Sequence, residues 1–141
     1  MDKNNEDFSL EANRNEQFFQ GANEHHYVIQ YQHYPRRLDA PHEIVAFEPN
    51  SEGVVGHLNW SDTTGQINEI HVDPAHRNRG LATRMYLMGK RLAVTDPNII
   101  APIHSKKART PAGEAWAQST HDYTPIAKKN IKKFRNWRYS D

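Results

Sequence analysis

The sequence predicts an α/β protein of the α+β type, with a mostly antiparallel sheet, a central amphipathic helix and a short helix near the C-terminus. Between residues 27 and 72, segments rich in β-branched and aromatic side chains alternate with turn-forming residues. From residue 79 the spacing of apolar residues changes to that of a helix. The length of 141 residues, without an internal repeat, fits one folded domain.

Four segments are expected to pair in order as an antiparallel meander. Pro49–Glu52 and Ser61–Gly65 are rich in turn residues and would connect the second to the third strand and the third to the fourth. The four expected strands are Tyr27–Gln32, Glu43–Glu48, Gly53–Trp60 and Gln66–Val72.

The central helix is expected from about Arg79 to Val94. Its apolar side chains recur at spacings of four, three and four, which places them on one helix face, and Asp96-Pro97 would end it. After it, Ile99–Ser105 reads as a short fifth strand, at an edge because it contains a proline. Thr110-Pro111 has the pattern of an N-cap followed by proline at the first helical position, and opens a short helix through Trp116.

The two ends of the chain differ from its middle in composition and in charge. Residues 1–24 hold six acidic and two basic residues and show no sustained period, so we expect a mobile or weakly helical acidic leader. Residues 25–120 would form the folded domain, and residues 121–141 a basic, aromatic tail. The formal net charge is only +1, which gives no general reason to expect a nucleic-acid-binding protein.

Composition excludes several classes of site. With no cysteine, the chain has no disulfide, thiolate nucleophile, iron–sulfur cluster or zinc site that needs sulfur. The nine histidines show no His-x-x-x-His spacing, so no metal site is expected, and neither a Gly-x-Ser-x-Gly elbow nor a Gly-x-x-x-x-Gly-Lys loop occurs. No apolar run is long enough to span a membrane and no secretory signal is evident, so a cytoplasmic protein without membrane contact is expected.

The most informative segment joins the last strand to the central helix. It reads Val72-Asp73-Pro74-Ala75-His76-Arg77-Asn78-Arg79-Gly80-Leu81-Ala82. The first N–H groups of a helix have no intrahelical partner and can bind an anion, and a glycine there permits close approach of the backbone. The pattern Val-x-Pro-x-x-Arg-x-x-Gly-x-Ala resembles the acetyl-CoA-binding motif of the GNAT superfamily of N-acetyltransferases.

This resemblance implies an acetyl-CoA site and transfer of an acetyl group to an amine of a small molecule or protein. The pyrophosphate would lie at the helix start, with positive charge from two arginines, and the pantetheine arm along the open edge of the preceding strand. The residues implied in cofactor binding are Ile70, His71, Val72, Arg77, Asn78, Arg79, Gly80, Leu81, Ala82 and Thr83. Many relatives dimerise, so a homodimer is a further expectation.

The reaction implied requires a base for the amine and an acid for the departing thiolate. Glu69 is the first candidate for the base and His71 the second, while the alternative is that these two side chains form only a polar pair on the sheet. Relatives often carry a tyrosine that serves as the acid on the helix after the fifth strand, and this chain has no tyrosine there. The acid could be Tyr123, if it folds back toward the site, or Ser105 or water, and the last option is that no dedicated acid exists.

A second segment narrows the resemblance within the superfamily. The pattern His104-Ser105-x-x-x-Arg109-Thr110-x-x-Gly113-x-x-Trp116-Ala117 is similar to that of short GNAT-like proteins of actinobacteria and their phages. The alternative to an enzyme is a non-catalytic GNAT-like protein that binds CoA or a macromolecule. The basic, aromatic segment from Lys128 to Tyr139 also allows nucleic-acid contact, which is the less favoured reading.

Overall fold

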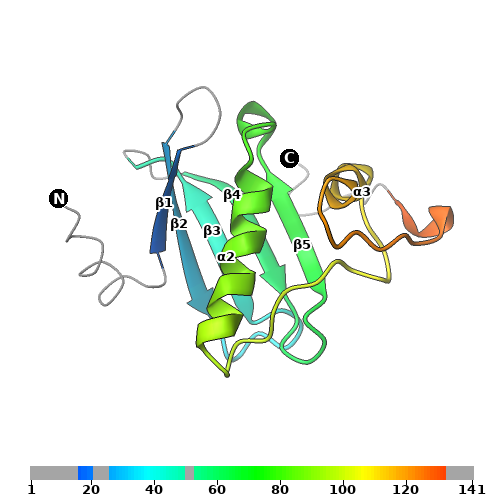
Figure 1. The fold of residues 1–141 in the computed structure, drawn as a ribbon, viewed down its shortest axis with the longest axis horizontal. Helices are drawn as coiled ribbons and strands as arrows, with labels where there is room; N and C mark the ends of the chain where they lie inside the picture. Colours follow the sequence, from blue (N-terminus) through cyan, green and yellow to red (C-terminus); the bar gives the residue numbers. More distant parts are fainter. Residues whose placement is uncertain (1–15, 21–25, 50–52, 133–141) are drawn as a thin grey trace.

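A five-stranded antiparallel sheet forms the body of the protein (Figure 1). The computed structural model describes residues 16–20, 26–49 and 53–132. The strands follow one another in the sheet in the order of the sequence, as a meander. They are β1 (Glu16–Gln20), β2 (His26–His33), β3 (His42–Phe47), β4 (Val54–Trp60) and β5 (Ile67–Val72).

The four strands predicted from sequence are confirmed, and β1 corrects the prediction for the leader. Glu16–Gln20 pairs with β2 as an antiparallel strand, whereas a mobile or weakly helical segment was expected there. The Glu-Gln-Phe-Phe-Gln sequence was too short and too polar at its ends to show a period by itself. Pairing with the exposed edge of β2 supplies the backbone partners that make it a strand. The remainder of the leader lies outside the described residues.

Helix α2 (Leu81–Thr95) covers one face of this sheet (Figure 1). The apolar residues predicted for one face of this helix, Leu81, Met85, Met88 and Leu92, are buried against aromatic and aliphatic side chains of the strands. The fully buried side chains include Tyr27, Ile29, Ile44, Leu58, Trp60, Leu81, Met85 and Met88. The helix begins two residues later than predicted because Gly80, at its N-cap, adopts a left-handed conformation with φ of 84°.

The short helix α3 (Pro111–Gln118) lies beside β5, on the far side from β4 (Figure 1). The predicted N-cap is confirmed, since Thr110 Oγ1 accepts a hydrogen bond from the backbone N–H of Gly113 at 3.0 Å. None of the helices in the described part of the chain is both long and apolar enough to cross a membrane.

The predicted fifth strand at Ile99–Ser105 is reduced to a single bridge. Only Ile103 pairs, in parallel, with Gln66 at the start of β5. Pro102 has no N–H for a ladder, and its ring packs instead over Gly89 of α2, where an added Cβ would lie 2.8 Å from Pro102 Cγ. The chain therefore touches β5 at one point and then diverges from it.

The segment assigned to the C-terminal tail is packed against the domain as far as it is described. The backbone N–H groups of Arg109 and Lys132 donate to Asn130 and Arg109 carbonyls respectively, which makes a parallel bridge between Arg109 and Ile131. Asp122 accepts a hydrogen bond from Tyr86 of α2. The expected boundary at residue 120 therefore does not mark the end of the packed chain, and residues 133–141 lie outside the described part.

Candidate functional site

A groove opens where β5 and the segment Ile99–Ser105 diverge from each other beyond their single bridge. Its volume is about 1280 Å³. Its sides are β5, the loop and first turn of α2, and the face of α3, and it continues to the β4–β5 turn and to Leu38 and Asp39 before β3. This arrangement follows from the single bridge between Gln66 and Ile103, because strands that pair throughout would leave no room between them.

The side of β5 that faces the groove is an open sheet edge. At the closed end, Ile67 N–H donates to Ile103 O and Ile103 N–H donates to Gly65 O, both at 2.8 Å. Beyond this point, no backbone hydrogen bond joins β5 to the diverging segment among residues that the structure describes. The expected pantetheine-pairing residues Ile70, His71 and Val72 all line the groove, but only Ile70 and Val72 turn their backbone groups to this edge, because Asp73 N–H donates to Val55 O and the same alternation turns the backbone of His71 to β4. A ligand with amide groups could pair with this edge as a neighbouring strand does.

The loop between β5 and α2 is shaped by two residues with positive φ. Asn78 has φ of 62° and Gly80 has φ of 84°. The first helical hydrogen bond of α2 runs from Arg84 N–H to Gly80 O, so the N–H groups of Leu81, Ala82 and Thr83 have no helical acceptor and lie at the groove. Successive backbone N–H groups at a helix start form a site suited to an anion such as a pyrophosphate.

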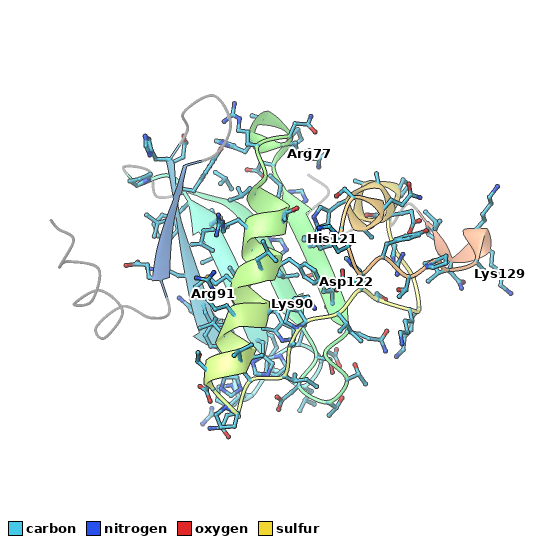
Figure 2. All side chains as sticks on the ribbon, in the orientation of Figure 1. Arg77, Lys90, Arg91, His121, Asp122 and Lys129 are labelled. Carbon is cyan, nitrogen blue, oxygen red and sulfur yellow. The ribbon has the colours of Figure 1, made fainter. Side chains whose placement is uncertain are left out.

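The two arginines of the loop point in different directions. Arg77 lines the groove, and its Nε donates to the carbonyl oxygen of Val72 at 2.7 Å (Figure 2). Arg79 is not among the groove residues, because its Nη1 donates to the hydroxyl of Tyr27 at 3.1 Å. Both arginines were expected to contribute charge beside a phosphate, but only Arg77 lies at the groove. Arg79 instead connects the loop to β2 through its hydrogen bond with Tyr27.

The candidate base Glu69 lies on the sheet face opposite to α2. The β4–β5 register pairs Leu58 with Ile70 on the α2 side, so the pairs Asn59–Glu69 and His57–His71 lie on the other side. Asn59 Nδ2 donates to Glu69 Oε1 at 3.2 Å, and His57 Nε2 is 3.9 Å from the same oxygen. Only 8% of the Glu69 side chain is exposed, yet it lines the groove.

The second candidate, His71, is bound to a carboxylate. Its Nε2 lies 3.1 Å from Oδ1 of Asp73, and its ring stacks on that of His57 with centroids 5.7 Å apart. Glu69, His71 and Asp73 all line the groove. Sequence analysis did not identify His57, Asn59 or Asp73 as site residues, because their relation to Glu69 and His71 depends on strand register and on the path of the loop.

The structure does not bring Tyr123 to this groove. Its hydroxyl donates to Glu114 Oε2 at 2.5 Å, and the residue is not among those that line the groove. This hydrogen bond raises the pKa of Tyr123, and the same bond, aided by donors from Gln118 and Arg109, lowers the pKa of Glu114 to about 2 despite its burial. Ser105, the alternative acid, does line the groove, and its Oγ accepts the N–H of Lys107 at 3.2 Å.

The α3 side of the groove is held by aromatic and polar contacts. Trp116 donates its indole N–H to Thr83 Oγ1 at 3.1 Å, and its ring meets Tyr86 and His104 edge-on. His104 Nε2 lies 3.2 Å from Asp122 Oδ1, and burial lowers the pKa of this histidine. Figure 2 shows Asp122 beside Lys90 of α2, the two charges being 3.2 Å apart. Trp116 therefore links α3 to the first turn of α2 across the groove.

The comparisons with known proteins agree with this arrangement. The sequence model of the acetyltransferase (GNAT) family matches residues 8–112, which is well over half of the chain. The chain therefore belongs to this family, and the antiparallel sheet with its central helix is the α+β fold expected from the resemblance. The match also includes β1 and so extends further toward the N-terminus than the domain boundary at residue 25 predicted from sequence. No curated protein and no solved structure matches.

Proposed function

We propose that the protein is an acetyl-CoA-dependent N-acetyltransferase that acts on an amine by direct attack. The observation that carries this proposal is the groove in which an anion-binding helix start continues into an open strand edge and then to a buried carboxylate. Membership of the acetyltransferase family supports the same general activity.

The groove residues fit acetyl-CoA in chemistry and in order. The N–H groups of Leu81, Ala82 and Thr83, with the Arg77 side chain, would hold the pyrophosphate. The free edge of β5 would pair with the amides of the pantetheine arm through the backbone of Ile70 and the N–H of Val72, since the backbone of His71 is turned to β4 and the carbonyl of Val72 already accepts a hydrogen bond from Arg77. When bound, acetyl-CoA supplies a thioester whose acetyl group an amine can take up.

Glu69 would act as the base. An amine is protonated at neutral pH and must lose a proton before it can attack a carbonyl carbon. Glu69 is the carboxylate on the groove strand, and Asn59 Nδ2 donates a hydrogen bond to its Oε1, which helps to hold the side chain in place. For the acid, Ser105 fits better than Tyr123, because it lies in the groove and its hydroxyl oxygen already accepts backbone N–H groups of Lys107 and Ala108.

Binding and transfer can be tested separately. Calorimetric titration with acetyl-CoA, with desulfo-CoA and ATP for comparison, should give saturable binding that ATP does not reproduce. A screen of amine acceptors, read as release of the CoA thiol, should then find a substrate. Glu69→Gln should lower kcat by about 10²- to 10⁴-fold, the usual contribution of a general base, and leave acetyl-CoA affinity unchanged. Glu43→Gln is the matched control, since Glu43 pairs with Arg37 outside the groove. Absence of acetyl-CoA binding would refute the enzyme proposal.

A second candidate function, binding of single-stranded nucleic acid, is favoured by one feature of the fold. The parallel bridge between Arg109 and Ile131 brings Lys106 and Lys107 to the same edge as the lysines around residues 128–132. These lysines are exposed and form no ion pair within the described part of the chain.

Oligonucleotide binding should weaken steeply with salt if this edge carries it. Replacing Lys128, Lys129 and Lys132 by glutamine should then flatten the salt dependence by about 0.7 per lost contact. Arg91→Gln, an exposed cation on α2, is the control (Figure 2). Binding that is absent, or unchanged in the lysine variant, would refute this candidate.

A further inference from the structure

The end of the groove that lies away from the start of α2 is formed by two loops. The turn after β4 contributes Ser61, Thr63 and Thr64, and the segment before β3 contributes Leu38 and Asp39. Under the proposed function, acetyl-CoA takes the start of α2 and the edge of β5, so the acceptor amine approaches between these two loops. The shape of this acceptor end therefore depends on what holds the loops in place.

One side chain is joined to both loops although it does not line the groove. His42 begins β3 directly after the first loop. Its Nε2 lies 2.7 Å from Oδ1 of Asp62 in the turn after β4. Asp62 does not line the groove, whereas its neighbours on both sides do. The other half of the turn is held at Gly65, whose carbonyl accepts the N–H of Ile103 at 2.8 Å. His42 thus holds the first half of the turn from behind.

The imidazole of His42 is itself held by stacking and by a hydrogen bond at each nitrogen. Its side chain is 1% exposed. The ring lies between those of Trp60 and His33, with centroids 5.3 Å and 5.1 Å away. Its Nδ1 lies 2.7 Å from the hydroxyl oxygen of Tyr31 on β2. The strand register produces this cluster, because it pairs His42 with His33 on one side and with Trp60 on the other.

The chemistry of the partners gives both hydrogen bonds a direction. A carboxylate only accepts, so His42 donates from Nε2 to Asp62. Burial raises the pKa of Tyr31 to about 12, so its hydroxyl keeps its proton and donates it to Nδ1. A single tautomer of the neutral imidazole therefore satisfies both bonds, and the chain of donors runs from the core to the turn.

We propose that His42 is a positioning residue for the acceptor amine, because the chain from Tyr31 through His42 to Asp62 holds the turn after β4 in the form that receives it. The inference rests on the proposed acetyltransferase function. The apparent affinity of a ligand falls in proportion to the fraction of molecules whose site is in the competent form. Loss of the bond at Asp62 should thus weaken acceptor binding and leave the acetyl-CoA end of the groove as it is.

The test compares Asp62→Ala, which removes the partner of the His42 N–H, with Asp62→Asn, whose amide oxygen can still accept it. The Asp62 side chain is 54% exposed, so neither change should prevent folding. The acceptor amine comes from the thiol-release screen. Its KM should rise up to about tenfold in Asp62→Ala, the order of one hydrogen bond to a charged group. In the same variant, kcat at saturating amine and the affinity for acetyl-CoA should stay unchanged, and Asp62→Asn should restore most of the wild-type KM.

A second readout does not require turnover. Long-range ¹H–¹⁵N NMR spectra of the histidine rings should show the His42 proton on Nε2 in the wild type. Amide exchange in residues 61–66 should be faster in Asp62→Ala than in the wild type or in Asp62→Asn. Asp96→Ala is the control, since this carboxylate accepts the N–H of Asn98 in a turn outside the groove lining, and it should change none of these measurements.

The outcomes separate this proposal from the proposed function. A His42 proton on Nδ1, an unchanged KM for the amine in Asp62→Ala, or an equal rise in KM in Asp62→Ala and Asp62→Asn would each overturn the positioning role and leave the acetyltransferase intact. A wild-type protein that acetylates no amine would refute the proposed function itself.

Discussion

Replacing Gly89 by alanine should destabilise the protein, although it lies in the interior of a helix. Alanine in place of glycine in a helix interior ordinarily stabilises by about 1 kcal/mol. Here the new Cβ would lie 2.8 Å from Cγ and 3.2 Å from Cδ of Pro102, and 3.2 Å from Cη2 of Trp60. Both rings are rigid and buried, and the Trp60 indole is held by Ile100 O at 2.7 Å. Overpacking of a buried site costs about 1–3 kcal/mol.

The crowding should exceed the helix-propensity gain, because neither ring can rotate away. Because the contact at 2.8 Å is closer than Cβ atoms ordinarily come to any neighbour, the cost should lie in the upper part of that range, about 2–3 kcal/mol, and less the propensity gain of about 1 kcal/mol this leaves a net loss of about 1–2 kcal/mol in the free energy of unfolding, or a Tm lower by about 3–6 °C. Urea unfolding followed by circular dichroism measures the change. Val94→Ala, at a position of α2 that is 85% exposed, is the control and should stabilise slightly through propensity alone. A Gly89→Ala protein as stable as wild type, or more so, would show that the segment at Pro102 is not held against α2 as described.

Three other predictions concern the loop between β5 and α2, the buried carboxylate of Glu114, and Tyr123 beside it. Gly80→Val should abolish acetyl-CoA binding in calorimetry while the sheet keeps its circular dichroism signal, because a β-branched residue cannot hold φ of 84° without strain; unchanged affinity in a folded variant would contradict the anion site. Glu114 has a folded-state pKa of about 2 against an ordinary 4.5, so its contribution to stability should be fully present above pH 4.5 and be lost as the pH falls through 2. In a plot of unfolding free energy against pH, Glu114→Gln should flatten the slope within this range. An unaltered slope would argue against the lowered pKa of Glu114. Tyr123→Phe should lower stability by about 1 kcal/mol through loss of one hydrogen bond and leave kcat unchanged, whereas Ser105→Ala should lower kcat; the reverse result would restore Tyr123 as the acid.

Elements with a strong local period were predicted correctly from the sequence. The spacing of Leu81, Met85, Met88 and Leu92 identified α2, and the Thr110-Pro111 pair located the start of α3 to the residue. The loop between β5 and α2 was recognisable because its glycine, its small residues and its position after a strand follow one another in sequence. Features that depend on neighbours along the chain are therefore accessible to this kind of reasoning.

Features that depend on distant partners were not predicted. β1 forms because an edge of β2 is open to it, and nothing in its own five residues indicates that edge. The same holds for the site, where Asn59 meets Glu69 through strand register and Arg79 turns away from the groove because Tyr27 lies within reach. The sequence offered one overlooked signal, since Asp73 stands two residues after His71 on an extended segment and so shares its side.

The single bridge between Gln66 and Ile103 has a consequence for the mechanics of the domain. On one side of it lie the sheet and α2, which share a continuous apolar core, and on the other lies α3, which is joined mainly by polar and aromatic side-chain contacts. A molecule bound along the open edge of β5 would tie these two parts together along their whole length. We therefore expect α3 to lose its amide protons to exchange sooner than the sheet in the free protein, and to be the part most slowed by a bound ligand. The ligand would then take the structural place of the missing strand.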